Sequence, residues 1–190
     1  MAYYANLRAE EHFRLDQEEL RRHFPLPRVL DGLFSLAERL YGIRVKEIPT
    51  RQSLSGIPAG ESAGAVEVWH PDVRFFTIDD GNGDRLGSFY LDLFSRSNKR
   101  AGAWMNTLDT GSPSTPETPG KPRLGMVCLN IHPPSAGDTV TLSHREVRTL
   151  FHEFGHLLHL MFTRVSIPSL AGTSVPRDFV EVPSQRSEER

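Results

Sequence analysis

Residues 143–161 read Ser-His-Arg-Glu-Val-Arg-Thr-Leu-Phe-His-Glu-Phe-Gly-His-Leu-Leu-His-Leu-Met and carry both a helix start and a helix period. Ser143 and Glu146 have the spacing of a capping box, in which each side chain satisfies a backbone N–H group of the first turn. Apolar residues then recur every three or four positions and form one continuous face: Val147, Leu150, Phe151, Phe154, Leu158 and Met161. The sequence therefore predicts a long packed helix over residues 143–163.

Three side chains of this helix have the spacing of a zinc site. His152 and His156 are four residues apart, so their rings project from one face about one turn apart. Two such imidazoles can bind one zinc ion, while Glu153 reaches a water held by the metal and can transfer its proton to a leaving amine. The pattern indicates metal-assisted hydrolysis; the alternative is an ordinary amphipathic helix with exposed histidines.

A catalytic zinc needs a third protein ligand and an open position. His159 lies seven residues after His152, but one rigid helix cannot bring three imidazoles spread over two turns onto one tetrahedral centre. We interpret His159 as a structural residue or one that orients a ligand. Asp178 and Glu181 lie on one face of a helix predicted over 176–190, so that one could ligate while the other orients. Spacing alone leaves the choice between them open.

The rest of the chain predicts an α+β fold. Apolar periodicity interrupted by prolines predicts two helices, at 16–23 and 27–42, within a helical region over 1–45. Two β-prone runs around an Asn-Gly turn predict a hairpin over 66–94, and 124–131 reads as a buried strand. These strands would form a small sheet over 66–131, with a Pro-rich loop at 106–122.

Composition excludes several classes of protein. The chain has 190 residues, enough for one domain, and its net charge of −2 gives no reason to expect nucleic acid or an anionic membrane as a partner. Its one cysteine excludes an internal disulfide and a cysteine-based structural zinc site. We see no signal-peptide core and no apolar run approaching the roughly 20 residues that span a bilayer. We therefore expect a soluble cytoplasmic protein, whose oligomeric state the sequence does not indicate.

Several segments along the chain resemble a known family, including Tyr3-Tyr4 followed by Leu-Asp-Gly-Leu at 30–33. Residues 149–159 (Thr-Leu-Phe-His-Glu-Phe-Gly-His-Leu-Leu-His) are similar to the zinc helix of the thimet oligopeptidase family of zinc metallopeptidases, which includes bacterial oligopeptidase A and peptidyl-dipeptidase Dcp. Residues 169–185 resemble the segment that delivers the third ligand of that family. Trp-His-Pro-Asp-Val at 69–73 and Phe-Tyr-Leu-Asp-Leu-Phe at 89–94 match as well. The resemblance extends over nearly the whole chain, to about Gln185.

The resemblance implies a role for each candidate residue. It makes His152, His156 and Glu181 the ligands of one zinc ion per chain, because Glu181 stands 25 residues after His156, as in the family pattern. It makes Glu153 the general base, and leaves Asp178 as a candidate for orienting a ligand. The implied activity is the hydrolysis of short peptides.

The resemblance also implies an architecture. The family has a mostly helical zincin-type catalytic core with a small sheet beside the zinc helix, whose edge strand could bind an extended peptide. Gly155 matches the family, and a glycine inside a helix costs about 1 kcal/mol relative to alanine. We expect a strand or the substrate to approach the helix closely at Gly155.

The chain departs from the family in length. Family members are several times longer, and the regions absent here include the Tyr and His side chains that stabilise the oxyanion. We therefore expect a partial catalytic domain over 1–190: either a working peptidase, or a truncated zinc-binding remnant that is weak or inactive. A binding module with an incidental motif is a third possibility. We also expect some apolar side chains to lie exposed: Val66, Phe75, Phe89 and Leu91.

Overall fold

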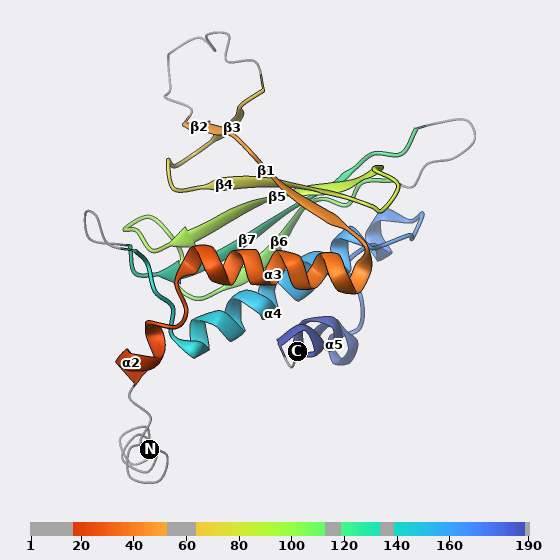
Figure 1. Ribbon diagram of the computed structural model, residues 1–190. Helices are drawn as coiled ribbons and strands as arrows, with labels where there is room; N and C mark the ends of the chain where they lie inside the picture. Colours follow the sequence, from red (N-terminus) through yellow and green to blue (C-terminus); the bar gives the residue numbers. More distant parts are fainter. Residues whose placement is uncertain (1–16, 53–63, 113–118, 134–138, 189–190) are drawn as a thin grey trace.

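The computed structural model describes residues 17–52, 64–112, 119–133 and 139–188, and Figure 1 shows a sheet with helices against one face. Five strands form the sheet in the order β1-β4-β5-β7-β6: Arg44–Ile48, Arg74–Asp79, Arg85–Phe94, Arg123–Ile131 and Trp104–Asp109. β5 and β7 are parallel and the other neighbours antiparallel. Two short parallel strands, β2 (Thr50–Gln52) and β3 (Val66–Val68), form a separate pair. The predicted α+β fold with a mixed sheet is confirmed.

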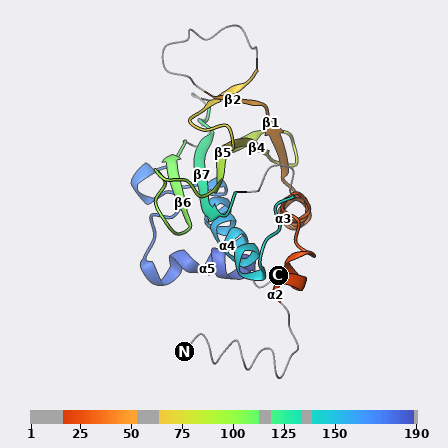
Figure 2. The same cartoon turned by 90° about the vertical axis from the view of Figure 1, so that its left-hand side faces the viewer.

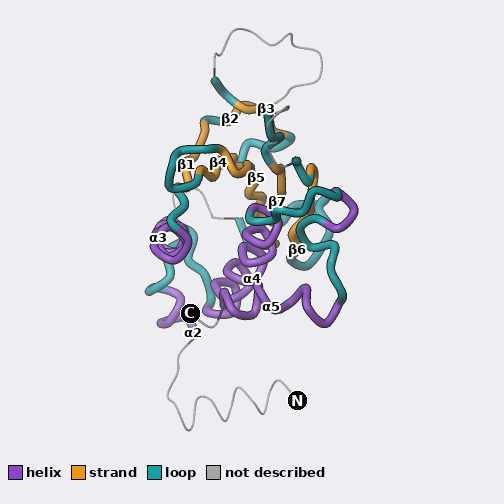
Figure 3. Tube along the Cα trace, turned by 90° about the vertical axis from the view of Figure 1, so that its right-hand side faces the viewer, coloured by secondary structure: helices purple, strands orange, loops and turns teal. Residues whose placement is uncertain are grey.

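The helices form two layers below the sheet. α3 (Leu26–Tyr41) and α4 (His144–Met161) lie against the sheet, and α5 (Arg177–Glu188) packs on the side of α4 that faces away from it (Figures 2 and 3). α2 (Gln17–Arg21) precedes α3, and the short helix η1 (Pro168–Leu170) lies between α4 and α5. The strands hold about four-fifths as many of the described residues as the helices do, so this part of the chain is less helical than the resemblance implied. None of the described helices is long and apolar enough to cross a membrane.

Four aromatic rings from four different elements pack together and hold α3 and α4 against the sheet. The ring of Phe34 on α3 lies 5.1 Å from that of Phe76 on β4 and 5.8 Å from that of Phe154 on α4, centroid to centroid. Phe89 on β5 completes the group, 6.0 Å from Phe154. Phe154 is buried, and aromatic pairs add about 0.5–1.5 kcal/mol beyond the area that they bury. This packing fixes the rotation of α4 about its axis and so decides which side chains point out of the core.

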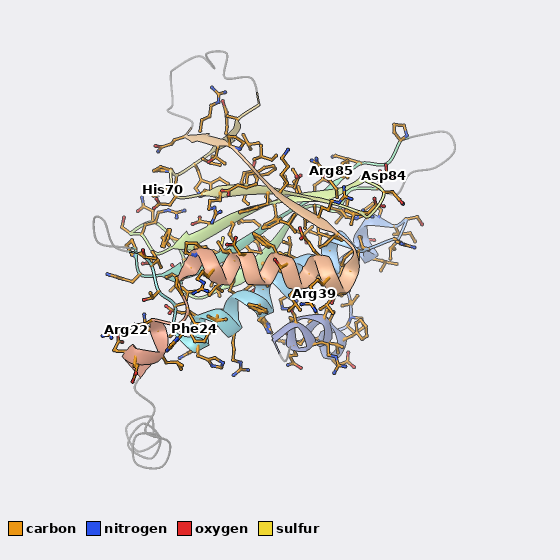
Figure 4. The ribbon with its side chains drawn as sticks, viewed as in Figure 1. Arg22, Phe24, Arg39, His70, Asp84 and Arg85 are labelled. Carbon is orange, nitrogen blue, oxygen red and sulfur yellow. The ribbon has the colours of Figure 1, made fainter. Side chains whose placement is uncertain are left out.

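The helical part of the prediction is confirmed in outline. The break falls at Pro25, and α3 ends at Gly42, which has the positive φ of 66° that glycine tolerates best. Phe24, labelled in Figure 4, accepts a hydrogen bond of 2.8 Å from the backbone of Leu142, which ties the start of α3 to the segment before α4. The helical region ends at Tyr41 rather than at residue 45, because β1 starts at Arg44. The predicted helical residues 1–16 lie outside the described part of the chain.

The strand predictions need two corrections. The hairpin is β4 and β5, with Asp84 and Arg85 near its tip (Figure 4), whereas β3 pairs with β2 instead. The loop predicted at 106–122 is wrong at its start, because residues 104–109 form β6, the edge strand beside β7. The prolines that suggested a loop begin at residue 113, so the N–H groups of 104–109 remain free to join a ladder. Residues 113–118 of that loop lie outside the described ranges.

The expected exposure of apolar side chains is wrong for three of four residues. Phe89 and Leu91 belong to the core beside α3 and α4, with 0% and 2% of their surface exposed. Phe75 lies on the other face, where its ring packs 4.8 Å from that of Tyr90. Val66 is half-buried. Phe75, Phe89 and Leu91 are therefore covered by other described residues.

Candidate metal centre

The helix that carries the candidate ligands starts at a complete capping box. The Ser143 hydroxyl accepts a hydrogen bond of 3.2 Å from the Glu146 N–H, and the Glu146 carboxylate accepts one of 2.7 Å from the Ser143 N–H. α4 then continues for 18 residues. Its start is therefore fixed two turns before His152, and the candidate residues lie in the helix interior, where the backbone is most rigid.

His152, His156 and Glu181 come together at one point. The Glu181 carboxylate oxygen Oε2 lies 3.1 Å from Nε2 of His152 and 3.3 Å from Nε2 of His156. One ligand atom from each of the three residues can be chosen so that all lie within 4.8 Å of one another. The two imidazoles stand edge to face, 4.9 Å apart at an angle of 86°. These three residues from α4 and α5 form the donor set of two nitrogens and one carboxylate oxygen that the sequence predicted.

The cluster is partly open to solvent. The exposed fraction of the side chain is 25% for His152, 13% for His156 and 46% for Glu181. Burial lowers the pKa of His156, against the opposing effect of the Glu181 carboxylate. Lowering the pKa favours the neutral imidazole, which is the form that binds a metal. Burial at the cluster thus favours the form of His156 that can bind a metal, while all three side chains keep part of their surface exposed.

Gly155 explains how α5 reaches the histidines. A Cβ atom at Gly155 would lie 2.6 Å from the Cα of Ser184 and 3.0 Å from the carbonyl oxygen of Pro183. The close approach expected at this glycine therefore exists, but the partner is the backbone of α5 rather than a strand or a substrate. Without a side chain at residue 155, α5 packs directly on α4 and carries Glu181 to the histidines.

Ser184 holds the Glu181 carboxylate and was not identified from the sequence. Its side chain is completely buried, and its hydroxyl lies 3.1 Å from Oε2 of Glu181, the same oxygen that faces both histidines. The hydroxyl also lies 2.9 Å from the Glu181 carbonyl oxygen. A spacing of three residues on one helix face was the only available signal. Ser184 thus limits the orientations open to the carboxylate.

Glu153 lies beside the cluster without belonging to it. Glu153 is 8% exposed. Burial raises the pKa of Glu153 and the Glu181 charge acts in the same direction, while His152 and the backbone N–H of Met105 on β6 act against them. A carboxyl group whose pKa is raised can accept a proton and release it again more readily than an exposed one. This environment suits the role of general base.

The other two candidates do not join the cluster. Asp178 is exposed in the first turn of α5, and within the described residues no hydrogen bond or ion pair links it to either histidine. His159 packs edge-on against Phe179 at 6.3 Å, and its buried Nδ1 atom has no hydrogen-bond partner in the described part of the chain. Nδ1 of His156 is likewise buried and unpartnered there. An orienting role for Asp178 or His159 stays a prediction.

An apolar pocket of about 260 Å³ lies between α3, α4 and α5, away from these ligands. It is lined mainly by Leu33, Leu36, Leu40, Phe151 and Leu158 and contains none of the cluster residues. Its lining is mainly apolar, and Tyr41, Arg186 and Ser187 supply its polar groups.

Several known proteins are similar in sequence to this chain. A sequence model described as Peptidase family M3 matches residues 1–189. Oligopeptidase A of Escherichia coli (strain K12) is 41% identical over 186 residues, which are 97% of this chain and 25% of that protein. Dipeptidyl carboxypeptidase of the same organism is 40% identical over 188 residues, 98% of this chain and 25% of that one. Probable cytosolic oligopeptidase A of Arabidopsis thaliana is 39% identical over 181 residues, 93% and 24% respectively. The chain spans about a quarter of the length of these relatives, and it belongs to peptidase family M3.

Proposed function

We propose that this chain is the catalytic segment of a zinc-dependent oligopeptidase that hydrolyses peptide bonds of short peptides. The observation that carries the proposal is the meeting of His152, His156 and Glu181 at one point, with Glu153 beside them. The names of the relatives, oligopeptidase A and dipeptidyl carboxypeptidase, support the same class of substrate.

The donor set fits zinc in identity and in spacing. Zinc binds imidazole nitrogen and carboxylate oxygen at about 2.0–2.2 Å in tetrahedral geometry, which separates ligand atoms by about 3.3–3.5 Å. The oxygen–nitrogen separations of 3.1 and 3.3 Å in the cluster are close to that value. Three protein ligands leave one position for water, which is the arrangement of a catalytic rather than a structural zinc site.

The chain's own residues would divide the work of hydrolysis. Zinc, when bound, supplies a Lewis acid that lowers the pKa of a water molecule towards neutrality. The Glu153 carboxylate takes the proton of that water and later delivers it to the nitrogen of the leaving amine. His152, His156 and Glu181 hold the site together, and the Ser184 hydroxyl keeps the Glu181 oxygen directed at the histidines.

The substrate would lie along β6. Within the described sheet β6 pairs only with β7, so its other edge has no strand partner there. An extended peptide can add to such an edge through main-chain hydrogen bonds, which are indifferent to its sequence. This mode of binding suits an enzyme that accepts many short peptides.

We further propose a cytoplasmic location. The chain has a single cysteine, which suits a reducing compartment. One relative is named as probably cytosolic, while another, from the same plant, is named as chloroplastic and mitochondrial. Fractionation of cells that express the tagged protein would test this location.

One experiment tests the proposed function. The purified chain is loaded with zinc, its metal content is measured by mass spectrometry, and a quenched fluorescent peptide is added with and without a chelator. We expect one zinc per chain and chelator-sensitive cleavage. Glu153→Gln should keep the zinc and lose the cleavage, whereas His156→Ala should lose both. Arg145→Gln, an exposed substitution on the same helix, is the matched control and should change neither.

Two other outcomes would contradict the proposal. Stoichiometric zinc with no cleavage, unchanged in Glu153→Gln, would favour the alternative, a zinc-binding segment without turnover. Absence of bound zinc at micromolar metal would remove both possibilities.

A further inference from the structure

The five-stranded sheet has a second face, which is turned away from α3 and α4 (Figure 1). Successive side chains of a strand point to opposite faces of its sheet. On β7, Val127 and Leu129 belong to the core beside the helices, so Met126 and Cys128 point to the second face. Trp104 pairs with Cys128 in the β6–β7 ladder and therefore lies on the second face as well.

A pocket of about 380 Å³ lies on this second face beside β6. Trp69 and Trp104 line it together with Leu108 of β6 and Met126 of β7. Trp69 is 44% exposed and Leu108 is 49% exposed, so other described residues leave much of their apolar surface open. Ligand pockets usually measure about 300–1,000 Å³. The pocket therefore has the size and the apolar lining to receive a bulky side chain.

The Trp69 ring is held in one orientation. Its indole N–H donates a hydrogen bond of 3.2 Å to Asp92, and its ring lies 5.0 Å from that of Tyr90, centroid to centroid. Asp92 is itself fixed, because it is 2% exposed and accepts hydrogen bonds from Arg96 at 2.8 and 2.7 Å and from Lys99 at 2.8 Å. A side chain that is already ordered loses little conformational freedom when a ligand binds. Trp69 therefore forms a preorganised wall of the pocket.

The charges of the lining decide which kind of side chain the pocket fits. Tryptophan faces can bind either an apolar group or a cation. Arg96, Lys99 and Arg100 line the pocket, against Asp92 as the one carboxylate of its described lining. That carboxylate already accepts hydrogen bonds from Arg96 and Lys99, so the lining carries a net positive charge. A further cation would be repelled, whereas a neutral apolar side chain would not.

We propose that this pocket is a subsite for an aromatic or large aliphatic side chain of the peptide bound along β6. The inference rests on the proposed function for the presence of a peptide at that edge. A peptide that adds to β6 continues the alternation of the sheet, so every second side chain lies on the face of Trp104 and Leu108. Main-chain hydrogen bonds to β6 supply general affinity, and the pocket adds a preference for one residue of the substrate.

Intrinsic fluorescence gives a direct test. The chain contains two tryptophans, and both line this pocket, so their emission reports on the proposed subsite. The whole chain, free of zinc, is titrated with short blocked peptides of alanine and serine that carry one internal Phe, one internal Lys or neither. Without zinc no peptide is cleaved by the proposed mechanism, and the titration measures binding alone.

Two variants alter the pocket and one serves as the control. Trp104→Ala removes one wall and leaves Trp69 as the reporter. Leu108→Ala shortens an exposed side chain and keeps both reporters, so it decides the question if Trp104→Ala does not fold. The matched control is Leu170→Ala, because Leu170 is 55% exposed, similar to Leu108 at 49%, and lies on η1 outside the pocket.

We expect the Phe peptide to shift the emission to shorter wavelength and to bind about tenfold more tightly than the peptide with neither residue, because the pocket buries the Phe ring. The Lys peptide should bind no more tightly than the peptide with neither. Trp104→Ala should remove most of the preference for Phe and Leu108→Ala should reduce it by about threefold. Leu170→Ala should leave it unchanged.

Three results would overturn the proposal: no change of emission with the Phe peptide up to millimolar concentration, a preference for Phe that both pocket variants retain, or tighter binding of the Lys peptide. The outcome is separable from that of the proposed function. Failure of the zinc-loaded chain to cleave peptides would remove the proposed function, whereas the zinc-free titration still decides whether the pocket binds an apolar side chain.

Discussion

Asp92 and Glu181 are both carboxylates surrounded by nitrogen donors, yet the protein satisfies them to different degrees. Asp92 is buried and paired with two permanent cations, Arg96 and Lys99. Glu181 is half-exposed and faces two imidazoles whose nitrogens lie at the spacing of a shared ligand. The first carboxylate is paired with fixed cations, whereas the second faces two imidazole nitrogens and forms with them a group that could hold a metal ion. We therefore interpret the first cluster as structural and the second as a candidate metal site.

The largest expected effect is a loss of activity without a loss of stability, on substitution of Glu153 beside the His–His–Glu cluster. Glu153→Gln should lower kcat by about 10²–10⁴-fold, because general acid–base catalysis contributes that much. The free energy of unfolding should not fall, because burial raises the pKa of Glu153 and the neutral amide is easier to bury than the ionised carboxylate. Peptide cleavage and urea denaturation, measured on the same zinc-loaded samples, check both statements. A large loss of stability together with activity would contradict the assignment of Glu153 as base.

The complementary prediction concerns the cluster around Asp92. Lys99→Met alone should lower the free energy of unfolding by about 3–5 kcal/mol, because it leaves Asp92 buried with one cation fewer. The loss should be smaller when Asp92→Asn is added, and the difference between the single and double variants is measured by urea denaturation. A loss in the double variant equal to the sum of the losses in Lys99→Met alone and Asp92→Asn alone would show that the two residues are not coupled.

Substitution of Ser184 should have a smaller effect, a loss of zinc affinity at the His–His–Glu cluster. Ser184→Ala should weaken zinc binding by about 10- to 100-fold, because it removes the hydrogen bond that directs Oε2 of Glu181. Ser184→Thr retains a hydroxyl and is the matched control for its loss. Competition with a chromophoric chelator measures the zinc affinities. A parent-like affinity in Ser184→Ala would show that Ser184 does not orient the Glu181 carboxylate for zinc binding.

Gly155 tests the packing that joins α4 to α5. Gly155→Ala places a methyl group 2.6 Å from the backbone of Ser184, so α5 must shift and carry Glu181 with it. Overpacking of about 1–3 kcal/mol should outweigh the gain of about 1 kcal/mol in helix propensity. Thermal unfolding with and without zinc measures the change, and the zinc-dependent part of the stability should shrink. A more stable variant with full zinc affinity would contradict the observed contact.

The smallest effect is the pH dependence that arises from Asp92. Its pKa in the folded chain is lowered below the ordinary value, so its contribution to stability is present above about pH 4 and is lost as the pH falls through the lowered pKa. One such group changes the unfolding free energy by at most about 1.4 kcal/mol per pH unit. Between pH 2 and pH 6, the free energy of unfolding measured by denaturation should change less with pH in the double variant Asp92→Asn with Lys99→Met than in the parent.

The sequence was most informative where local rules act alone. The capping box at Ser143 and Glu146, the stop at Gly42 and the β4–β5 hairpin are each specified by residues close in the chain, and each was predicted. The β6 strand was missed because its pairing with β7 depends on contacts distant in sequence, and a nearby run of prolines dominated the local signal. The burial of Phe75 was missed for the same reason, since it depends on Tyr90 across the hairpin.

The residues of the candidate site were likewise predictable only where local spacing identifies them. Two candidate ligands, His152 and His156, and the candidate base Glu153 follow from helical spacing. Asp178 and Glu181 were equivalent by spacing, and only the resemblance separated them. Ser184 was not predicted, because its spacing of three residues from Glu181 is common to many helical serines and does not by itself mark a role. The partner of Gly155 required knowledge of how α4 and α5 cross.

The most direct test of the central claim is the X-ray absorption spectrum of the zinc-loaded chain at the zinc edge. The account predicts two imidazole nitrogens at about 2.0–2.1 Å and carboxylate and water oxygens at about 2.0–2.2 Å. In Glu181→Ala the carboxylate contribution should disappear while both imidazoles remain. A spectrum unchanged by Glu181→Ala, or one with fewer than two imidazoles in the parent, would contradict it.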